Sequence, residues 1–431
     1  MDALIALLLI VFMLVVLGSG LWIGLSLLGV AVVAMQFFTE RPVGDAMVLT
    51  IWGSTTSWTL TALPLFLWMG EILFRSRLAE GMFRGLAPWL NRLPGRLLHV
   101  NVIGCTIFAA VSGSSAATCA TIGKITLPEL DKRGYPDRLS VGTLSGAATL
   151  GLLIPPSIIM IVYGVAANVS IAELFMAGVI PGVLLALLFM GYIVFWALRH
   201  PDQIPAADAA LTLKQKLYEG RHLLPVVALI GLVLGSIYTG VATATEAAAL
   251  GVAGSLALSA IEGSLSRQRL LDGLASAARV YCMIGLILAG ASFLTLSMGF
   301  IGLPRHLAEF IGGLGLSPFA LMVMLVMFFI VLGCFLDGIS MVVLTMAVLL
   351  PTVEAAGFDL VWFGIFIVLV VEMAQITPPV GFNLFVIQGL TKREITWIAR
   401  VSMPLFRLMC AFVLFVYFVP GTVTWLPGLM Q

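Results

Sequence analysis

Long, uninterrupted apolar runs dominate the chain and determine its fold class. Stretches of about 20 apolar residues recur almost from end to end, and a helix of that length crosses a hydrocarbon layer of about 30 Å. The runs are continuous rather than alternating, so they predict helices and not the strands of a membrane barrel. The chain of 431 residues is 61% apolar and only 10% charged, which excludes a soluble globular enzyme. We therefore predict an all-α polytopic membrane protein.

The distribution of positive charge predicts how these helices thread through the membrane. Most of the 22 lysines and arginines lie in five segments, residues 75–99, 124–138, 199–221, 262–279 and 391–400. Basic loops favour the cytoplasmic side, so we expect these five inside and the base-poor connections outside, together with both termini. Full spans are then expected over residues 49–74, 139–165, 175–198, 222–240, 246–261, 280–300, 362–388 and 401–420. Residues 3–38 are too long for one span, and Gly18-Ser19-Gly20 divides them into two.

Two apolar segments do not fit simple spans and predict re-entrant hairpins. Residues 100–123 have a basic loop on both flanks, so the segment must enter and leave on the same side. Its centre reads Val111-Ser112-Gly113-Ser114-Ser115, a small polar turn. Residues 317–350 have base-poor flanks and carry small and polar residues from Gly333 to Ser340, which indicates a second hairpin that enters from outside. Irregular backbone at this depth is tolerated only when it is buried in protein or lines a watery cavity.

The two halves of the chain repeat each other in opposite orientation. Leu127-Pro128 recurs as Leu350-Pro351, and Pro155-Pro156 recurs at the same separation as Pro378-Pro379. The basic loops of the first copy correspond to base-poor loops of the second, so the copies are inverted, a plan typical of secondary transporters. The predicted domains are N-terminal scaffold helices over 1–48, a first repeat over 49–198 with a hairpin at 100–127 and an interrupted helix at 139–165, a linker over 199–279 with scaffold helices 222–240 and 246–261, and a second repeat over 280–431 with a hairpin at 317–351 and an interrupted helix at 362–388.

Each repeat also contains a helix that is interrupted by two consecutive prolines. The stretches 149–157 and 375–383 fall in the middle of spans, where prolines remove backbone donors and clash with preceding carbonyls. The freed carbonyls and nearby hydroxyl and amide oxygens suit Na⁺, while half-helix N-termini favour an anionic group. The alternative is a simple proline kink that neighbouring Ser and Thr repair, which two symmetric copies make less attractive.

Charge and cysteine usage exclude several other classes. The net charge of +1 argues against nucleic-acid binding, and all five cysteines lie in apolar segments without a CxxC pair, so neither a disulfide framework nor a zinc site is indicated. Gly123-Lys124 lacks the other residues of a P-loop, which argues against ATP-driven pumping. The first apolar run has no basic n-region and no clear cleavage site, so we expect it to be retained.

Five motifs together resemble the large membrane subunit of tripartite ATP-independent periplasmic (TRAP) transporters. The resemblance covers nearly the whole chain and rests on their order and spacing. The motifs are Gly113-Ser114-Ser115-Ala116-Ala117-Thr118, Gly151-Leu152-Leu153-Ile154-Pro155-Pro156-Ser157, Ala177-Gly178-Val179-Ile180-Pro181-Gly182, Thr245-Glu246-Ala247-Ala248-Ala249 and Ile376-Thr377-Pro378-Pro379-Val380-Gly381-Phe382-Asn383-Leu384-Phe385-Val386.

The resemblance implies an uptake system in a bacterial inner membrane, with both termini of this chain on the periplasmic side. Its partners would be a small four-helix membrane subunit and a periplasmic substrate-binding protein. Substrates of the family are mostly organic acids such as C4-dicarboxylates, 2-oxo acids and sialic acid. The family couples uptake to a Na⁺ gradient, uses no ATP and no organic cofactor, and moves a transport domain past a scaffold in elevator fashion.

The resemblance also assigns site residues position by position. The first Na⁺ site would use Ser112, Gly113, Ser114, Ser115, Gly146, Thr149, Gly151 and Pro155. The second Na⁺ site would use Asp337, Gly338, Ser340, Met373, Gln375 and Thr377. The substrate would lie between the hairpin tips, in contact with Ser115, Pro156, Ser340, Pro379 and Asn383.

Two carboxylates lie inside the membrane, where such groups are functional candidates by default. Asp337 is placed at the second hairpin tip and Glu372 just before the second Pro-Pro pair. Either one is alternatively a structural acceptor for a helix terminus. A proton contribution through Glu372 is a further hypothesis. Glu246 follows Thr243 by three residues, a spacing that predicts a capping box at the start of a span.

Two other functions are weighed against that of a binding-protein-dependent permease, and the role of one basic loop is left open. A membrane-embedded enzyme would need a convergent nucleophile and base or a metal cluster, and the sequence offers neither. A stand-alone ion-coupled anion carrier with the same inverted plan would work without a binding protein. The basic loop over 75–99 either binds anionic lipid headgroups or only anchors the topology.

Overall fold

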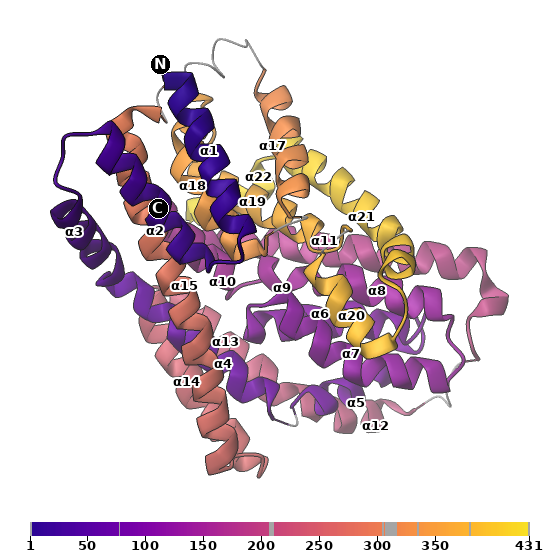
Figure 1. The fold of residues 1–431 in the computed structure, drawn as a ribbon. Coiled ribbons are helices and arrows are strands. Elements are labelled where there is room, and N and C mark those ends of the chain that lie inside the picture. Colours follow the sequence, from indigo (N-terminus) through magenta and orange to yellow (C-terminus); the bar gives the residue numbers. More distant parts are fainter. Residues whose placement is uncertain are drawn as a thin grey trace.

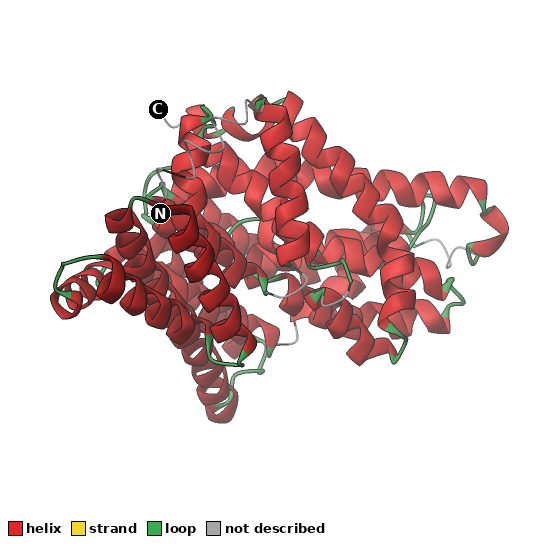
Figure 2. Ribbon diagram, turned by 45° about the horizontal axis from the view of Figure 1, so that its top comes forward, coloured by secondary structure: helices red, strands yellow, loops and turns green. Residues whose placement is uncertain are grey.

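Helices account for all regular secondary structure in the part of the chain that the structure describes. The structure is a computed structural model, and it describes residues 2–76, 78–206, 211–303, 306, 317–333, 336–378 and 381–429. Figure 2 shows helices joined by loops, and no strand occurs among these residues. The prediction of an all-α protein is confirmed.

One group of helices, which we name the long-helix group, packs around α15 (Arg267–Ile301), a helix of 35 residues. Its other members are α1 (Asp2–Gly18), α2 (Ile23–Phe38), α3 (Val43–Thr55), α4 (Ala62–Phe74), α13 (Leu224–Tyr238) and α14 (Ala244–Ile261). Helix α15 contacts α2, α3 and α4, and α14 contacts α4 and α13 (Figure 1). A Cβ built on Gly290 of α15 would lie 2.6 Å from the carbonyl oxygen of Gly24 in α2, so small residues allow this close helix approach.

The second group, which we name the hairpin group, contains the two predicted hairpins and the two interrupted helices. Its members are α6 (Leu98–Ser112), α7 (Ser115–Lys132), α8 (Asp137–Ala148), α9 (Leu150–Leu153), α10 (Ile158–Ala167), α11 (Ile171–Arg199), α17 (Pro318–Leu332), α18 (Gly338–Ala355), α19 (Leu360–Ala374), α20 (Phe382–Thr391) and α21 (Ile395–Phe418). Figure 1 shows this group beside the long-helix group. Contacts of α4 with α6 and α10, and of α15 with α18, join the two groups.

The first hairpin turns where the sequence predicts it. Helix α6 ends at Ser112, and Gly113 adopts a left-handed conformation with φ of 58°, which glycine accepts because it has no Cβ. Ser114 begins α7 as its N-cap, and its side chain accepts a hydrogen bond from the backbone N–H of Ala117 at 3.4 Å. Helices α6 and α7 pack along each other, so the chain returns on itself at this turn.

The second hairpin differs from the first in how its two arms pack. Helix α17 packs on α19, whereas α18 packs on α10, α15 and α19. The turn between the arms includes Cys334 and Phe335, which lie outside the described residues. Asp337 caps the second arm at its start. The arms of this hairpin are therefore held by neighbouring helices, whereas α6 and α7 pack against each other as well as against neighbouring helices.

Both helices with Pro-Pro pairs are interrupted, as predicted. Helices α8 and α9 lead to Ile154, which is extended, and α10 begins at Ile158 after a bend of 41°. In the second copy α19 ends at Ala374 and α20 begins at Phe382. Helices α7, α10, α18 and α20 thus begin inside a predicted hairpin or span and not at its end, because each follows a turn or a proline break.

Four segments differ from their predicted outlines. The span expected over 49–74 is two helices, α3 and α4, bent by 55°. The hydroxyls of Thr55 and Thr56 bond back to carbonyls of the preceding turn, a pattern that bends helices. Helix α15 begins at Arg267, well before the expected residue 280, because Ser266 caps it. The basic loop over 75–99 contains the helix α5 (Leu78–Leu90), and the loop over 199–221 contains α12 (Leu213–Gly220).

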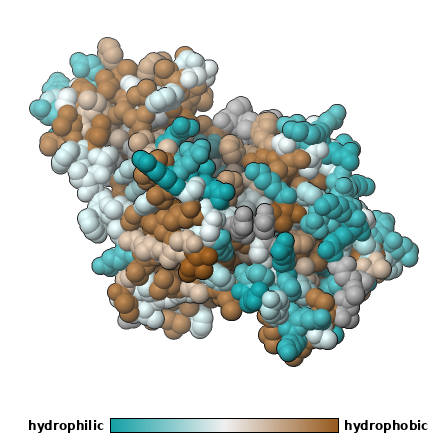
Figure 3. All heavy atoms as spheres, turned by 90° about the horizontal axis from the view of Figure 1, so that it is seen from below, coloured by the Kyte–Doolittle hydropathy of each residue, from teal (hydrophilic) through white to brown (hydrophobic). Residues whose placement is uncertain are grey.

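The apolar helices support a multi-pass membrane protein. Among the described residues, five helices are long and apolar enough to cross a membrane, and three bent pairs raise the number to as many as eight. Large apolar side chains are exposed on many of these helices, as expected for surfaces that face lipid or a partner. Figure 3 views the molecule from below and shows hydrophilic residues gathered over much of this end, beside brown apolar flanks.

Candidate functional site

The first hairpin tip packs directly against the first proline break. The carbonyl oxygen of Gly113 accepts a hydrogen bond from the backbone N–H of Ile158 at 3.3 Å. A Cβ built on Gly151 would lie 2.5 Å from the Cα and 2.7 Å from the backbone nitrogen of Ser115. A Cβ on Gly113 would lie 2.8 Å from the carbonyl oxygen of Pro156. Two glycines therefore bring the tip and the break into backbone contact.

The hydroxyls of Ser112 and Thr149, in the first predicted Na⁺ site, make local hydrogen bonds at the tip and at the end of α8. The Ser112 hydroxyl lies 2.8 Å from that of Thr118 and donates to the carbonyl oxygen of Ser114 at 3.3 Å. The Thr149 hydroxyl donates to the carbonyl oxygen of Gly146 at 2.6 Å. Serine and threonine thus hold the carbonyls at the end of α8 and at the tip. Sequence reasoning missed Thr118, although its spacing of six residues from Ser112 across a turn was visible.

The second hairpin tip contacts both interrupted helices. A Cβ built on Gly338 would lie 2.8 Å from Nε2 of Gln375 and 3.0 Å from Cδ1 of Ile159. Asp337 accepts hydrogen bonds from the backbone N–H groups of Ile339 at 3.1 Å and Ser340 at 3.4 Å, and the Ser340 hydroxyl donates to the same carboxylate. The capping alternative for Asp337 is therefore what the geometry shows.

The remaining residues of the second predicted Na⁺ site line the break after α19. Met373 and Ser340 are fully buried, and Gln375 and Thr377 are only 8% exposed. The Thr377 hydroxyl donates to the carbonyl oxygen of Ala374 at 2.9 Å, three residues back, which is the same spacing as in the bond from Thr149 to Gly146. Pro379, a predicted substrate contact, lies outside the described residues.

Several buried polar atoms around the breaks have no hydrogen-bond partner among the described residues. They include both amide atoms of Asn383, Oε1 of Gln375 and Oε2 of Glu372. The backbone N–H of Asn383 donates to the carbonyl oxygen of Gln375 at 3.1 Å, so Asn383 and Gln375 lie at the two ends of one hydrogen-bonded turn. Buried polar groups are nearly always paired, because an unpaired one loses its hydration without compensation. These atoms are therefore candidates to bind a transported ion or substrate.

Glu372 joins the second repeat to the first. Its side chain is fully buried, and Oε1 accepts a hydrogen bond from the backbone N–H of Leu152 at 3.1 Å. Leu152 follows Gly151, and a Cβ on Gly151 would lie 2.5 Å from the Cα of Ser115 at the first hairpin tip. Glu372 of α19 thus bonds to the first break, next to the residue that meets the tip. Sequence reasoning singled out the residue, but not this cross-repeat contact.

Two further polar residues position the site from a distance, and sequence reasoning missed both. The amide of Asn101 in α6 donates to the carbonyl oxygen of Ser140 and to the hydroxyl of Thr143, each at 3.0 Å, which ties the hairpin to α8. The Tyr163 hydroxyl donates to the carbonyl oxygen of Leu360 at 2.7 Å, which ties α10 to α19. A single polar side chain within an apolar run was the available signal.

Outside the site, the predicted capping box of α14 is confirmed. The carboxylate of Glu246 accepts hydrogen bonds from the backbone N–H and the hydroxyl of Thr243, both at 2.8 Å. The Thr243 hydroxyl in turn accepts from the backbone N–H of Glu246 at 3.3 Å. Glu246 therefore caps the N-terminus of α14, the helix to which it belongs.

Hairpin tips that pack on proline breaks, within an all-helical and strongly apolar chain, define a membrane transporter and not an enzyme. The family model described as "Tripartite ATP-independent periplasmic transporter, DctM component" matches residues 9–422. The chain belongs to this family, and it is a large permease of a TRAP transporter.

Named relatives extend over nearly the full chain. The C4-dicarboxylate TRAP transporter large permease protein DctM of Rhodobacter capsulatus is 32% identical, over 96% of each chain. The ectoine/5-hydroxyectoine TRAP transporter large permease protein UehC of Ruegeria pomeroyi is 31% identical, over 87% of each chain. The isethionate TRAP transporter permease protein DctMQ of Oleidesulfovibrio alaskensis is 31% identical, over 94% of this chain and 63% of its own length.

Two solved structures share the fold. The YdaH transporter of Alcanivorax borkumensis, whose structure is described as revealing an unusual topology, superposes with a TM-score of 0.64 over 95% of this chain and 98% of its own. The Neisseria gonorrhoeae MtrF protein superposes with a TM-score of 0.52 over 96% of this chain and 94% of its own. Both are 13% identical to this chain, so the likeness concerns the fold alone.

Proposed function

We propose that this permease imports an organic anion together with Na⁺ across the inner membrane, and that the anion binds between the two hairpin tips. The observation that carries the proposal is the convergence of helix N-termini. Helices α7, α10, α18 and α20 begin at Ser115, Ile158, Gly338 and Phe382. The starts of α10 and α18 are in contact, since a Cβ on Gly338 would lie 3.0 Å from Cδ1 of Ile159, and Ile158 bonds to Gly113 just before α7. Helix α20 packs against α7.

Helix N-termini supply the positive potential that an anion needs at this depth. The first N–H groups of a helix point along its axis and carry a partial positive charge, which favours a carboxylate. Helix α20 begins without a side-chain cap, and two of its first N–H groups, those of Asn383 and Leu384, donate to the carbonyl oxygens of Gln375 and Gly381. Asn383 in the same turn has an amide without a partner among the described residues. The start of α20 is therefore the preferred contact for the substrate carboxylate.

Oxygen ligands next to each tip support Na⁺ as the coupling ion. Na⁺ is a hard cation that prefers carbonyl, hydroxyl and carboxylate oxygens. The first set lies around Ser112 and Thr149, and the second lies around Asp337, Gln375 and Thr377. Binding of the ions would fix each tip against its break, which in turn completes the substrate site between them.

The division into two groups of helices supports an elevator motion. The hairpin group carries both tips and both breaks, while the long-helix group contacts it through α4, α13 and α15. We propose that the hairpin group moves as one body past the long-helix group. Basic loops then remain on the cytoplasmic side, and both termini face the periplasm.

The partners follow from the tripartite family. We propose a small membrane subunit beside this chain and a periplasmic binding protein that delivers the anion. A stand-alone anion carrier is the second candidate, because its hairpin plan would be the same. Genes for a small subunit and a binding protein next to the gene of this chain would favour the tripartite transporter, and their absence would favour the stand-alone carrier.

Uptake into proteoliposomes tests the proposal. The liposomes contain this chain and its small subunit, and labelled C4-dicarboxylates and 2-oxo acids are offered with and without binding protein and an inward Na⁺ gradient. Uptake that requires both the binding protein and Na⁺ supports the proposal. Uptake without the binding protein assigns the chain to stand-alone carriers, and uptake that ignores Na⁺ overturns the coupling.

A proton contribution through Glu372 is the remaining hypothesis for coupling. The side chain is fully buried next to the first hairpin tip, and one of its oxygens has no partner among the described residues. Burying a carboxyl group in such a place costs less free energy when the group is protonated and neutral. Unchanged substrate-to-ion ratio and pH profile in Glu372→Gln would refute the hypothesis.

A further inference from the structure

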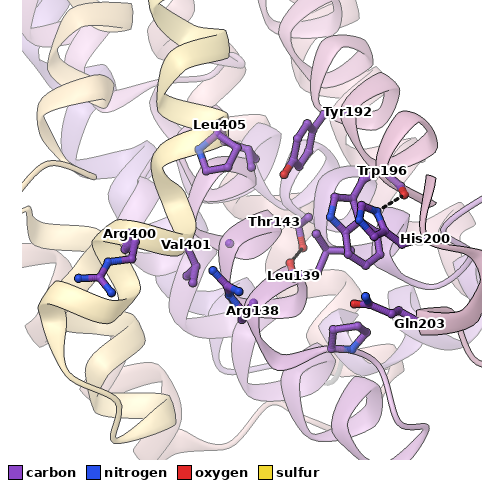
Figure 4. Close-up of a pocket in the computed structure, with 13 residues that line it drawn as sticks. Arg138, Leu139, Thr143, Tyr192, Trp196, His200, Gln203, Arg400, Val401 and Leu405 are labelled. Carbon is purple, nitrogen blue, oxygen red and sulfur yellow. Dashed lines mark hydrogen bonds between the residues drawn. The ribbon is translucent and has the colours of Figure 1, made fainter. Parts of the chain in front are cut away.

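A cavity of about 290 Å³ lies away from the hairpin tips, between the start of α8, the end of α11 and the start of α21. Its polar lining includes Arg138, Tyr192, Trp196 and Gln203. Figure 4 shows the Arg138 side chain reaching toward the cavity and the Tyr192 hydroxyl pointing in from the opposite wall. All three helix ends adjoin predicted cytoplasmic loops, so we expect the cavity at the cytoplasmic surface of the membrane.

The charge of this cavity is uncompensated. Its lining contains two arginines, Arg138 and Arg400, and no carboxylate. Neither guanidinium has an ion-pair or hydrogen-bond partner within the described part of the chain. In contrast, nearby Arg393 is paired with Asp137 at 2.6 Å. The Arg400 guanidinium extends outward in Figure 4, and rotation of an exposed side chain is fast, so it can swing toward a bound anion.

Arg407 extends the positive charge into the membrane. It lies near the middle of the 24-residue span α21 and is exposed, again without a partner among the residues that the structure describes. It follows Arg400 by seven residues, so both lie on the same helix face. Side chains on a helix tilt toward its N-terminus, which directs Arg407 back toward the cavity. An exposed arginine inside the membrane is expensive unless it reaches a polar group or an anion.

Besides Thr143 and His200, the rest of the lining is apolar, and on α21 this apolar surface continues along the membrane span. Val401, Pro404 and Leu405 of α21 form one wall of the cavity. Further along the same helix, Leu414 and Phe418 are exposed. Trp196 and Tyr192 are residues that favour the membrane interface, because each joins an apolar ring to a polar edge. The site thus offers hydrogen-bond donors and positive charge at one end and the apolar surface of α21 at the other.

We propose that this cavity binds the phosphate of an anionic phospholipid, with an acyl chain lying along α21. A phosphate accepts hydrogen bonds from guanidinium, phenol and indole donors, all of which meet here. Basic pockets between membrane helices on the cytoplasmic side suit anionic headgroups. A free phosphate ion would satisfy the donors equally well, but it would leave the apolar wall without a partner. The lipid is therefore the occupant that matches the whole cavity.

Native mass spectrometry of the intact chain with its small subunit tests the proposal. The protein is stripped of lipid in detergent and then offered phosphatidylglycerol or the zwitterionic phosphatidylcholine. We expect the wild type to retain phosphatidylglycerol preferentially, and Arg138→Gln to retain it about fivefold less, because one basic residue near a surface contributes about 1 kcal/mol. Arg267→Gln changes an exposed basic residue outside the cavity and serves as the matched control. Equal retention in Arg138→Gln and Arg267→Gln, or equal retention of the two lipids, overturns the proposal.

Two further measurements, both on the wild type, distinguish a lipid phosphate from a free phosphate ion. Inorganic phosphate is added to the lipid-free protein, and thermal unfolding is followed. Stabilisation by inorganic phosphate as large as that by phosphatidylglycerol would identify a soluble anion and overturn the lipid. Phosphatidylglycerol with a photoreactive acyl chain is then bound to the wild type. Labelling of α21 peptides supports the proposed position of the acyl chain, and labelling confined to other helices overturns it.

Discussion

Replacing Gly151 with alanine is the most direct test of the contact between hairpin tip and proline break. The new Cβ would lie 2.5 Å from the Cα of Ser115 and 2.9 Å from the backbone carbon of Ser114. Carbon atoms in contact are ordinarily about 3.5–4.0 Å apart, so the tip must move by about 1 Å. These neighbours are backbone atoms, which no side-chain rotation can relieve.

The expected magnitude follows from the cost of overpacking. Forcing one extra carbon into a packed site costs about 1–3 kcal/mol, which lowers the population of the native tip geometry about 5- to 150-fold. Because the same tip carries Ser112 to Ser115, we expect the apparent affinity for Na⁺ to fall by a factor in this range. The stabilisation of the detergent-solubilised protein by Na⁺ should fall in parallel.

The assay measures Na⁺-dependent uptake in proteoliposomes and thermal unfolding as a function of Na⁺ concentration. Gly191→Ala is the matched control, because a Cβ on Gly191 in α11 meets no atom within 4 Å. That variant should behave as the wild type, or gain up to about 1 kcal/mol from better helix propensity. An apparent Na⁺ affinity of Gly151→Ala within twofold of the wild type would refute the proposed role of the contact.

Four further predictions concern single elements of the site. Ser114→Leu with Ser340→Leu should abolish Na⁺-dependent uptake while size-exclusion chromatography still shows an assembled complex, and robust residual uptake would contradict the site assignment. Asn383→Leu should raise the KM for the anion at least about tenfold with little loss of thermal stability, since a buried amide without a partner stabilises the fold little; an unchanged KM would exclude it from the substrate site. Glu372→Gln should flatten the pH profile of uptake if the carboxyl carries a proton, and an identical profile would leave the residue a structural link to Leu152. Tyr163→Phe removes the hydrogen bond to Leu360 and should lower the stability by about 1 kcal/mol, measured by thermal unfolding, without a change in KM; a change in KM with normal stability would indicate a role in transport instead.

Local pattern was sufficient to predict much of the site. The first turn was placed at Gly113 and Ser114 because small polar residues interrupt an apolar run there, and the structure ends α6 and begins α7 at these residues. The breaks after Ile154 and Ala374 followed from proline chemistry, which acts within one or two turns. Such features depend only on neighbouring residues, so they can be seen in the sequence.

Contacts between distant segments could not be predicted in the same way. Nothing in the pattern around Glu372 indicates that its carboxylate bonds to Leu152, or that Asn101 bonds to Thr143. Likewise, the bend after α3 and the early start of α15 at Arg267 depend on hydroxyl bonds and caps that compete with longer apolar signals. Each of these outcomes depends on which partner a polar group finds after the helices have packed.

The sequence by itself determined the membrane location, the inverted halves, the hairpins and the proline breaks, because hydropathy, charge asymmetry and backbone chemistry are local properties. Only the tertiary structure decided which tip meets which break, that Gly151 brings Ser115 into backbone contact, and that Glu372 reaches the first repeat. It also brought Arg138, Tyr192 and Leu405 together around one cavity. These relations join residues far apart in the chain, and close packing, which no local pattern encodes, selects among the many possible partners.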